Sequence, residues 1–499
     1  MQAVTALPFT PYRTYKPLVC LLLCALADFL FYGEPAGWTF GLFGAILLAA
    51  CYIYAPAGQM QLRNLLALLT LGQCLISVDA PSLLSISLIS LGLISLALLH
   101  DTRWHGNIRI WWSRMVRFLW SFPGRFFKDK RSFFRINRRP ETRQYRETVM
   151  RGWTLPLLST GIFISLLAMG NPIIAAWTWE IDWSVVFRLF EFNRFFFWGF
   201  CICFIWALLR GRMRIKTRKI TIDPERTGFL TWLFPANAIS RSLVLFNLLF
   251  AVQTLMDVMY LWGGVSLPEG MSHAGYAHRG AYPLVFTALL AAAFTLVVYR
   301  RGQEVPPVTR TLVYVWIGQN VLLVASSIMR TMLYIENYSL TYLRLSALIW
   351  MLVVTGGLIL ILYRIIHNKS NLWLVNANGL MLLTVLYLCS FVPFKQYIAD
   401  YNAAHNREIA GKGSNLDVYY LYELGYTSLP AFEQLLKNPS LGQETREYVQ
   451  LYHSWLLHDL QNAHANWRGW TGQTHRLMKM ACPNKRNCNI LPGRQKPRG

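Results

Sequence analysis

The sequence has 499 residues, of which 54% are hydrophobic and only 14% are charged, and its formal net charge is +24. Because a soluble globular protein carries about 25% charged residues, this composition excludes a water-soluble fold with a polar surface of ordinary size. The basic residues are gathered in a few blocks between apolar runs. We therefore expect anionic lipid headgroups, and no nucleic acid, as the partner of these charges.

Apolar runs long enough to cross a bilayer occur about eleven times along the chain. The hydrocarbon core is about 30 Å thick and a helix rises about 1.5 Å per residue, so a span needs about 17–25 residues. The first run, which holds Asp28, is interpreted as a span rather than a cleavable signal peptide. The predicted spans are 17–33, 38–55, 62–79, 82–99, 153–170, 193–210, 238–262, 281–300, 311–334, 342–364 and 372–392.

These runs predict an all-α fold, a polytopic transmembrane helical bundle with a small helical extramembrane domain at its C-terminal end. We divide the chain into a four-span region at 1–100, a basic loop at 101–152, a seven-span core at 153–392 and a helical tail at 393–499.

Loops that are poor in basic residues alternate along the chain with loops that are rich in them. Loops after odd-numbered spans are poor, since 171–192 holds Arg188 alone and 263–280 holds Arg279 alone. The loop at 101–152, after an even-numbered span, holds 14 basic residues against four acidic ones. Because positively charged loops stay in the cytoplasm, we predict a cytoplasmic N-terminus and an exported C-terminal tail.

The basic loop contains a pattern typical of an amphipathic helix on a membrane surface. One helical face carries Trp104, Ile108, Trp111, Trp112, Met115, Phe118 and Leu119. After Pro123 this pattern breaks into basic and aromatic residues. Either the loop is a platform for lipid or a cytosolic partner, or it anchors the topology, which we favour. The basic residues expected to face lipid are Arg103, Arg109, Arg114, Arg117, Arg125, Lys128, Lys130 and Arg131.

The tail is predicted to hold three helices followed by a basic segment from about 483. The first carries Val418, Leu421, Tyr422 and Leu424 and ends at Gly425. Ser428 is the predicted N-cap of the second, which carries Phe432, Leu435 and Leu436. The third has Tyr448, Leu451, Tyr452, Trp455 and Leu456 at helical spacing.

Nine cysteines are present, and most of them lie in apolar runs, where they act as small hydrophobic residues. Only Cys482 and Cys488 lie in polar sequence. If the tail is exported, these two could form a disulfide, and the alternative is two free thiols. No C-x-x-C pair exists, so we expect neither zinc nor redox chemistry.

A set of ionisable residues falls at the predicted outer ends of the later spans. A charge at the centre of the bilayer costs at least about 2.5–3.5 kcal/mol, so such residues usually have a partner. Asp257 could pair with Arg330 or with Arg344. The members of this candidate polar cluster are Asp257, Glu269, His273, His278, Arg279, Arg330, Glu336 and Arg344.

Two interpretations of this candidate polar cluster stay open. It is either an outward-facing pocket that binds a substrate or relays protons, or a buried ion pair that fixes helix register. A metal site is not expected, because His273 and His278 are five residues apart, which suits no single helix face, and no third ligand is obvious.

Three groups of residues carry a resemblance to a known family. They are 257–264 with 267–270 and 276–280, then 333–338 with 340–345, and finally Tyr401-Asn402 with 417–421 and 429–431. Over about 235–440 the chain resembles a bacterial polytopic membrane family, domain of unknown function 4173, which has a close relative numbered 4153. The resemblance implies a protein of the bacterial cytoplasmic (inner) membrane and supplies no activity. Gly275 stands where the family has an acidic residue, which counts against a His–carboxylate dyad.

Three functions remain open. The chain is a scaffold or signalling accessory whose tail contacts envelope proteins, a small-solute transporter with a path along Asp257 and Arg330, or a membrane-embedded enzyme for envelope lipid or glycan. In the enzyme, Asp257, Glu336 or His278 would act as base. Phosphate-loop, dinucleotide, zinc-protease and serine-hydrolase motifs are absent. We favour the scaffold, expect no cofactor and assign no catalytic residue.

Overall fold

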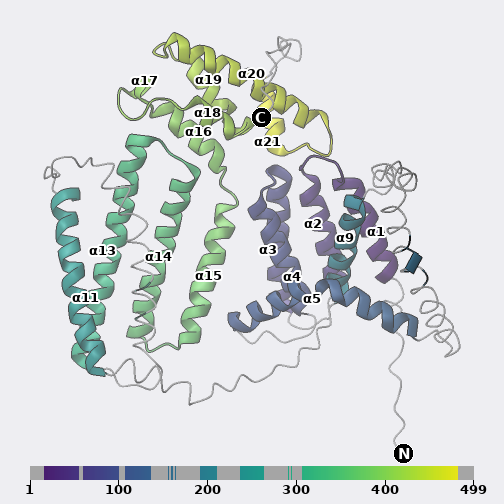
Figure 1. The fold of residues 1–499 in the computed structure, drawn as a ribbon, viewed down its shortest axis with the longest axis horizontal. Coiled ribbons are helices and arrows are strands. Elements are labelled where there is room, and N and C mark those ends of the chain that lie inside the picture. The colour runs from purple at the N-terminus through teal and green to yellow at the C-terminus, as the bar shows by residue number, and fades with distance from the viewer. Residues whose placement is uncertain are drawn as a thin grey trace, which may run out of the picture. The chain divides into compact units, whose positions relative to one another are not determined.

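The computed structural model describes residues 16–54, 60–99, 107–135, 192–210, 236–262 and 306–481, with six further single positions. Within these residues the regular elements are all helices, which confirms the all-α class (Figure 1). The predicted spans at 153–170 and 281–300 lie almost wholly outside the described residues.

Six described helices are long and apolar enough to cross a membrane, so the chain is a multi-pass membrane protein. The six are α3 (Met60–Asp79), α9 (Phe192–Arg210), α11 (Ala236–Asp257), α13 (Pro307–Tyr338), α14 (Tyr342–Ile366) and α15 (Asn371–Cys389). Two shorter apolar helices, α2 (Thr39–Tyr54) and α4 (Leu83–Leu99), also coincide with predicted spans, as does α1 (Lys16–Phe31). The count of eleven spans stays a prediction.

The chain divides into two compact units, of which the first comprises Met1–Gly72, Ile89–Arg103 and Trp112–Met213. In this unit α1 and α9 lie side by side and run in opposite directions. Lys16 Nζ donates to the carbonyl oxygen of Leu209 (3.1 Å), whereas Asp28 at the other end accepts from Arg194. Small buried residues such as Cys20, Cys24 and Ala27 let the two backbones approach closely.

Helix α5 (Ile108–Arg135) continues through Pro123, where the sequence pattern had suggested a break. A proline inside a helix removes one backbone hydrogen bond. Packing of the aromatic rings on either side of Pro123 against α9 stabilises the helical path. Phe122 contacts Phe200 (centroids 5.7 Å apart), and Phe126 contacts Trp206 (5.9 Å).

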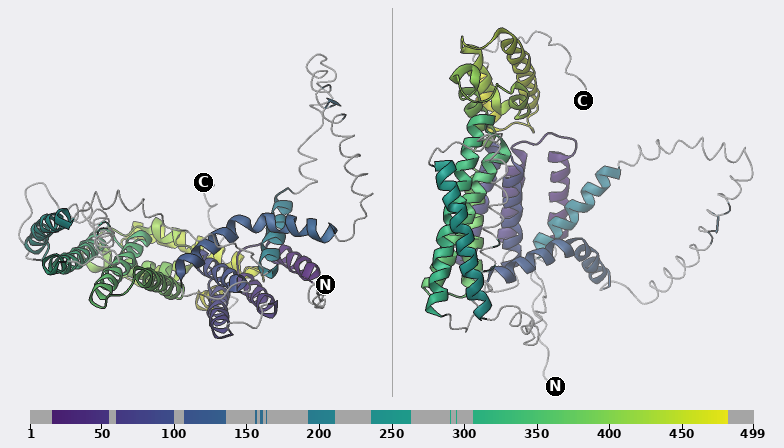
Figure 2. Two further views of the ribbon diagram at one scale, coloured as in Figure 1. Left: turned by 90° about the horizontal axis from the view of Figure 1, so that it is seen from below. Right: turned by 60° about the vertical axis from the view of Figure 1, so that its left-hand side comes forward.

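The second unit comprises Gln73–Leu88, Trp104–Trp111 and Arg214–Gly499. Helices α11 and α13 run parallel in it, because Ser240 pairs with Thr309 near their starts and Asp257 pairs with Arg330 near their ends. Helix α14 packs beside α13, and α15 packs beside α14; Figure 2 shows the same group of helices in two further views.

After α15 the chain forms a small helical domain, named here the tail domain (residues 394–481). Its helices are α16 (Phe394–Ala404), α17 (Arg407–Ala410), α18 (Val418–Glu423), the 3-10 turn η4 (Tyr426–Ser428), α19 (Leu429–Lys437), α20 (Gln443–Ala465) and α21 (Gly472–Ala481). The three predicted helices correspond to α18, α19 and α20.

The predicted helix ends in the tail domain are partly confirmed. Gly425 follows α18 with a φ of +78°, a conformation that glycine adopts without strain. Helix α19 begins after Ser428 as predicted, but the Ser428 hydroxyl donates to the Gly425 carbonyl oxygen (2.8 Å) instead of capping the helix. The tight 3-10 turn directs the side chain back along the chain.

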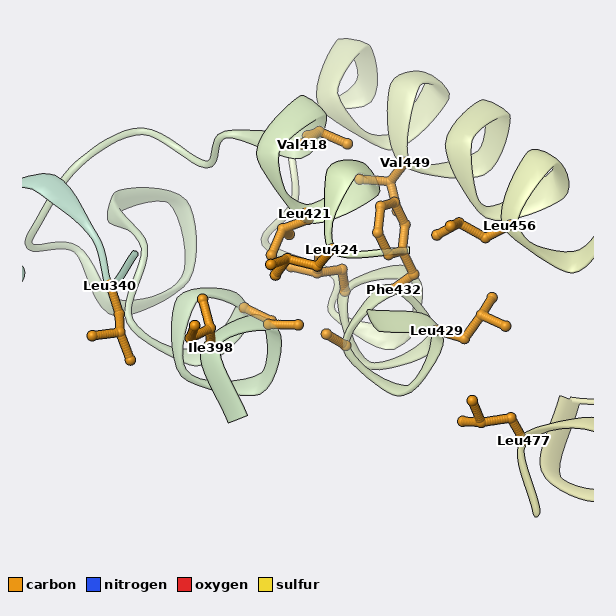
Figure 3. Packing of buried hydrophobic residues seen from close by; sticks show 14 of the residues in the cluster. Leu340, Ile398, Val418, Leu421, Leu424, Leu429, Phe432, Val449, Leu456 and Leu477 are labelled. Atoms are coloured by element: carbon orange, nitrogen blue, oxygen red, sulfur yellow. The ribbon is translucent and has the colours of Figure 1, made fainter. Parts of the chain in front are cut away.

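The core of the tail domain extends into the membrane region. Phe432, Leu429 and Ile398 are fully buried in it, and Ile335 of α13 and Leu340 of the α13–α14 turn belong to the same cluster (Figure 3). The tail domain and the α13–α14 hairpin thus share one hydrophobic core.

Candidate functional site

A buried ion pair joins α11 to α13. Arg330 Nη2 donates to Asp257 Oδ1, and Gln253 Nε2 donates to the same oxygen at 3.0 Å. The two side chains are only 3% and 1% exposed. An intramembrane charge is expensive unless it has a partner, and of the two predicted partners the structure places Arg330 beside Asp257.

The sequence positions both residues on the shared face of the two helices. On α11 the residues that face α13 recur at heptad-like spacing, including Leu243, Phe250 and Asp257. Directly after Asp257 the helix widens into a π-helical turn, η3 (Val258–Trp262). Such turns are rare and often occur at functional positions, so the π-helical turn marks this end of α11 as a candidate functional position.

The other described members of the candidate polar cluster have different surroundings. Arg344 Nη1 donates to the carbonyl oxygens of Tyr338 (2.6 Å) and Ser339, and its guanidinium lies over the Tyr334 ring (4.4 Å). These carbonyl groups end α13, so Arg344 satisfies acceptors that a helix terminus leaves open. Ser339 has a φ of +69°, which turns its carbonyl towards Arg344.

Glu336 is exposed at the end of α13, next to the tail domain. The pKa of Tyr401 in α16 is raised, first by burial and then by the negative charge of Glu336. The candidate polar cluster is thus separated into a buried pair, a helix-capping arginine and a surface carboxylate. Glu269, His273, His278 and Arg279 lie outside the described residues.

Asn402 holds the tail domain to the α13–α14 turn, a role that sequence reasoning missed. The buried Asn402 accepts from the backbone N–H of Leu340 (2.7 Å) and donates to its carbonyl oxygen (2.8 Å). One amide side chain therefore satisfies both backbone groups of a residue in the shared core. Nearby, the N–H of Tyr342 donates to the Tyr420 hydroxyl (3.0 Å).

A second junction, also missed, links the end of α3 to α21. Asp79 accepts two parallel bonds from Arg476, Nη1–Oδ1 at 2.6 Å and Nη2–Oδ2 at 2.8 Å. The carboxylate lies at the N-terminus of α21, where the helix dipole favours a negative charge. Thr471 and Thr474 cap the same terminus with reciprocal bonds.

Gly472 makes this junction possible, because a Cβ at that position would overlap Asp79 Oδ1. We expect Gly472→Ala to displace α21 from Asp79 and to lower the free energy of unfolding by about 1–3 kcal/mol, the usual cost of overpacking. Thermal unfolding of the purified full chain checks this. Gly442→Ala is the matched control, since its Cβ would meet only Thr445 Oγ1 at 4.0 Å. Equal effects of both changes would contradict the junction.

An ion pair also ties α1 to α9 in the first unit. Arg194 binds both oxygens of Asp28, with Nε–Oδ1 at 3.0 Å and Nη2–Oδ2 at 2.6 Å, and Trp198 Nε1 donates to Oδ1 at 2.8 Å. Sequence reasoning placed Asp28 near the outer end of its span without a partner.

Helix α5 presents an exposed apolar stripe formed by Trp112, Val116, Leu119 and Trp120, with Trp120 91% exposed. Met115 and Phe118, predicted on the same face, are buried instead. The single predicted face is therefore divided between the protein and the exterior.

The predicted lipid-facing basic residues differ in exposure. Arg109 and Arg117 are exposed and Arg114 is half-buried. Arg125 is buried, where it donates to Ser121 Oγ (2.8 Å) and lies over the Phe118 ring (4.6 Å). The expectation that Arg125 faces lipid is therefore wrong, because the face of α5 that carries it packs on the protein. Arg103 and the side chains of Lys128, Lys130 and Arg131 lie outside the described part.

The seven cysteines of the apolar runs are free thiols, and five of them are buried. Cys482 and Cys488 lie outside the described residues, so their pairing stays a prediction. Among the described residues no three His, Cys, Asp or Glu side chains gather in a way that could hold a metal ion.

Comparison with known proteins gives one match. A family model described as "Domain of unknown function (DUF4153)" matches residues 42–435. This is the family expected as the relative of number 4173, and the match begins well before residue 235, where the resemblance starts. It therefore covers most of α2 and all of α3–α5, as well as the α13–α14 hairpin, α16–α18 and most of α19. No curated protein and no solved structure matches the chain.

Proposed function

The chain belongs to the DUF4153 family, a domain of unknown function, and on that premise we propose that it is a membrane scaffold of the bacterial cytoplasmic membrane. Its membrane helices hold the tail domain in a fixed orientation at the outer surface, where the tail domain contacts an envelope protein. The N-terminus lies in the cytoplasm and the C-terminus outside.

The shared core carries this proposal. A domain on a flexible linker reorients freely, whereas Ile335 and Leu340 are buried among residues of the tail domain. Asn402 adds two buried hydrogen bonds at the same place. A domain that is attached rigidly to the membrane helices suits a protein that presents a binding surface at a fixed height and orientation above the membrane.

The proposed sidedness agrees with contacts inside the second unit. The tail domain contacts the α13–α14 turn and Asp79, both of which the charge pattern assigns to the outer side. At the opposite side, the N–H of Ile108 donates to Asn376 Oδ1 (3.0 Å) near the start of α15. Ile108 and Asn376 both lie next to loops that are rich in basic residues, which the charge pattern assigns to the cytoplasmic side.

The transporter and enzyme hypotheses draw less support from the site. Arg330 holds the Asp257 carboxylate, and Arg344 donates to the carbonyl oxygens that end α13. Asp257, one of the three candidate bases, and both arginines therefore serve helix contacts. A scaffold needs no further role for them.

Site-directed crosslinking in living cells tests the scaffold. Tyr448 is half-exposed on α20 of the tail domain, so Tyr448→Cys, with Cys482 and Cys488 replaced by serine, presents a single tail-domain thiol. We expect a membrane-impermeant, photoreactive maleimide to label it and to give one crosslinked product of defined size. Leu456→Cys, buried on the same helix, is the control. Absence of labelling would contradict the exported side, and labelling without a defined product would contradict the scaffold.

We also propose that α5 lies in the headgroup region and binds anionic lipid. Its exposed apolar stripe would enter the acyl boundary, while Arg109 and Arg117 meet phosphate groups. Each basic residue near an anionic leaflet contributes about 1 kcal/mol, so Arg109→Gln with Arg117→Gln is expected to weaken binding by about 2 kcal/mol, or roughly 30-fold.

Lipid retention by the purified protein, measured by mass spectrometry after exchange into mixed detergent and phosphatidylglycerol, checks this value. Lys437→Gln with Lys479→Gln removes the same charge from the tail domain and serves as the control. If both pairs reduce retention equally, general charge attraction explains the binding and α5 has no specific part in it.

A further inference from the structure

Four buried polar atoms of neighbouring residues on α11 and α13 have no hydrogen-bond partner in the part of the chain that the structure describes. They are Asn247 Oδ1, Trp316 Nε1, Gln319 Oε1 and Asn320 Oδ1. Trp316 and Asn320 are 2% and 1% exposed. A buried polar group without a partner is costly, and in native proteins it usually marks a bound water or another ligand.

The orientation of each amide is fixed by its nitrogen. Asn247 Nδ2 donates to the carbonyl oxygens of Leu243 (2.7 Å) and Leu312 (3.1 Å), and Gln319 Nε2 donates to that of Asn247 (3.2 Å). Asn320 Nδ2 donates to the carbonyl oxygen of Trp316 (2.7 Å). Exchanging oxygen and nitrogen would set two acceptors against each other in every case. The three open atoms of the amides are therefore acceptors.

The four atoms require a ligand that both donates and accepts. Three carbonyl oxygens need donors, and the indole N–H of Trp316 needs an acceptor. A bare cation would serve the oxygens but would meet the positive end of the indole N–H, and a charge in the bilayer is expensive. Water has two donors and two acceptor sites.

We propose that this interface holds a pair of bound water molecules. Two waters supply four hydrogens, of which three reach the amide oxygens and one joins the waters, and one water oxygen accepts from Trp316. Aromatic rings pack against the Trp316 ring, with ring centroids 5.4 Å from Phe246, 6.2 Å from Phe250 and 5.4 Å from Phe294.

The water site is separate from the Asp257–Arg330 pair. Asn247 precedes Asp257 by ten residues, or about 15 Å along the helix, and Phe250, Leu323 and Val324 fill the interface between them. The waters therefore bridge the parallel helices α11 and α13 at this level of the interface and do not reach the ion pair.

X-ray radiolysis of the full chain in lipid nanodiscs tests the site, because it generates hydroxyl radicals from bound water in place. We expect Trp316 to be oxidised despite its burial, with exposed Trp467 of the tail domain as the upper reference and Phe432, buried in the tail-domain core, as the lower one. Asn320→Leu removes one acceptor and should abolish oxidation of Trp316.

Two results would overturn the proposal. One is a wild-type Trp316 that stays as unmodified as Phe432, and the other is oxidation that persists unchanged in Asn320→Leu. If Asn320→Leu does not fold, Gln319→Leu removes another acceptor on the same helix, and the same loss of Trp316 oxidation is expected.

Discussion

Replacing Arg330 by leucine is expected to lower the free energy of unfolding by about 3–5 kcal/mol, because the buried Asp257 carboxylate then loses its guanidinium partner. Replacing both partners removes the charge as well as its complement. The double variant Asp257→Leu with Arg330→Leu is therefore expected to recover most of the loss. Thermal unfolding of the purified protein, followed by fluorescence-detected gel filtration, measures all three proteins.

Arg310→Leu is the control for this cycle, since Arg310 lies on the same helix but is exposed and bonds Tyr314 (2.8 Å). A double variant as unstable as the single one would show that the loss does not come from an unpaired Asp257 carboxylate. The cycle also separates structure from transport, because a pair needed only for helix packing is replaceable by two leucines.

Asn402→Ala is expected to loosen the tail domain while the membrane helices stay folded. Each unsatisfied buried backbone group costs about 1–3 kcal/mol, and the change leaves the N–H and the carbonyl oxygen of Leu340 without this partner, for a loss of about 2–6 kcal/mol at this junction. Hydrogen exchange of the α16 amides should then accelerate by roughly 30-fold or more when local opening governs exchange.

Asn402→Asp keeps the acceptor for the Leu340 N–H but sets a buried carboxylate oxygen against the Leu340 carbonyl oxygen, so its effect should be at least as large as that of alanine. Asn462→Ala, an exposed position on α20 that bonds His458, serves as the control. Unchanged protection of α16 in Asn402→Ala would show that the apolar core alone holds the tail domain to the hairpin.

The membrane helices were largely predictable from the sequence because a bilayer sets a minimum length for an apolar run. The predicted spans at 62–79 and 342–364 differ from α3 and α14 by two residues at one end. The prediction at 311–334 was too short, because α13 extends by about a turn at each end into polar sequence. Hydropathy marks the apolar part of a helix and not its caps.

The contacts between helices were less predictable. Asp257 had two candidate partners at similar depth, and Arg344 went to the α13 carbonyls because Ser339 adopts a positive φ that composition does not reveal. Asp79 and Arg476 are 397 positions apart, and neither stands out as a lone intramembrane charge. Their pairing depends on Gly472 leaving space at the start of α21.

In the tail domain, too, the helices were easier to predict than their contacts. Helical spacing predicted α18, α19 and α20, whereas α16 and α21 have shorter apolar patterns that become meaningful only against the shared core. Ile335 and Leu340 fell between the predicted spans at 311–334 and 342–364, and nothing in that short connection indicated that they are buried among tail-domain residues.

That shared core has a consequence for biogenesis. Ile335 leaves the ribosome 97 residues before Phe432, its partner in the shared core, which at about 5–20 residues per second is a delay of roughly 5–20 s. During this interval the tip of the α13–α14 hairpin is inserted but its apolar residues have no cover. With the tail domain exported as proposed, the hairpin waits for the rest of its own chain to be translocated, so any stall between α15 and α19 leaves an apolar tip available to chaperones or proteases.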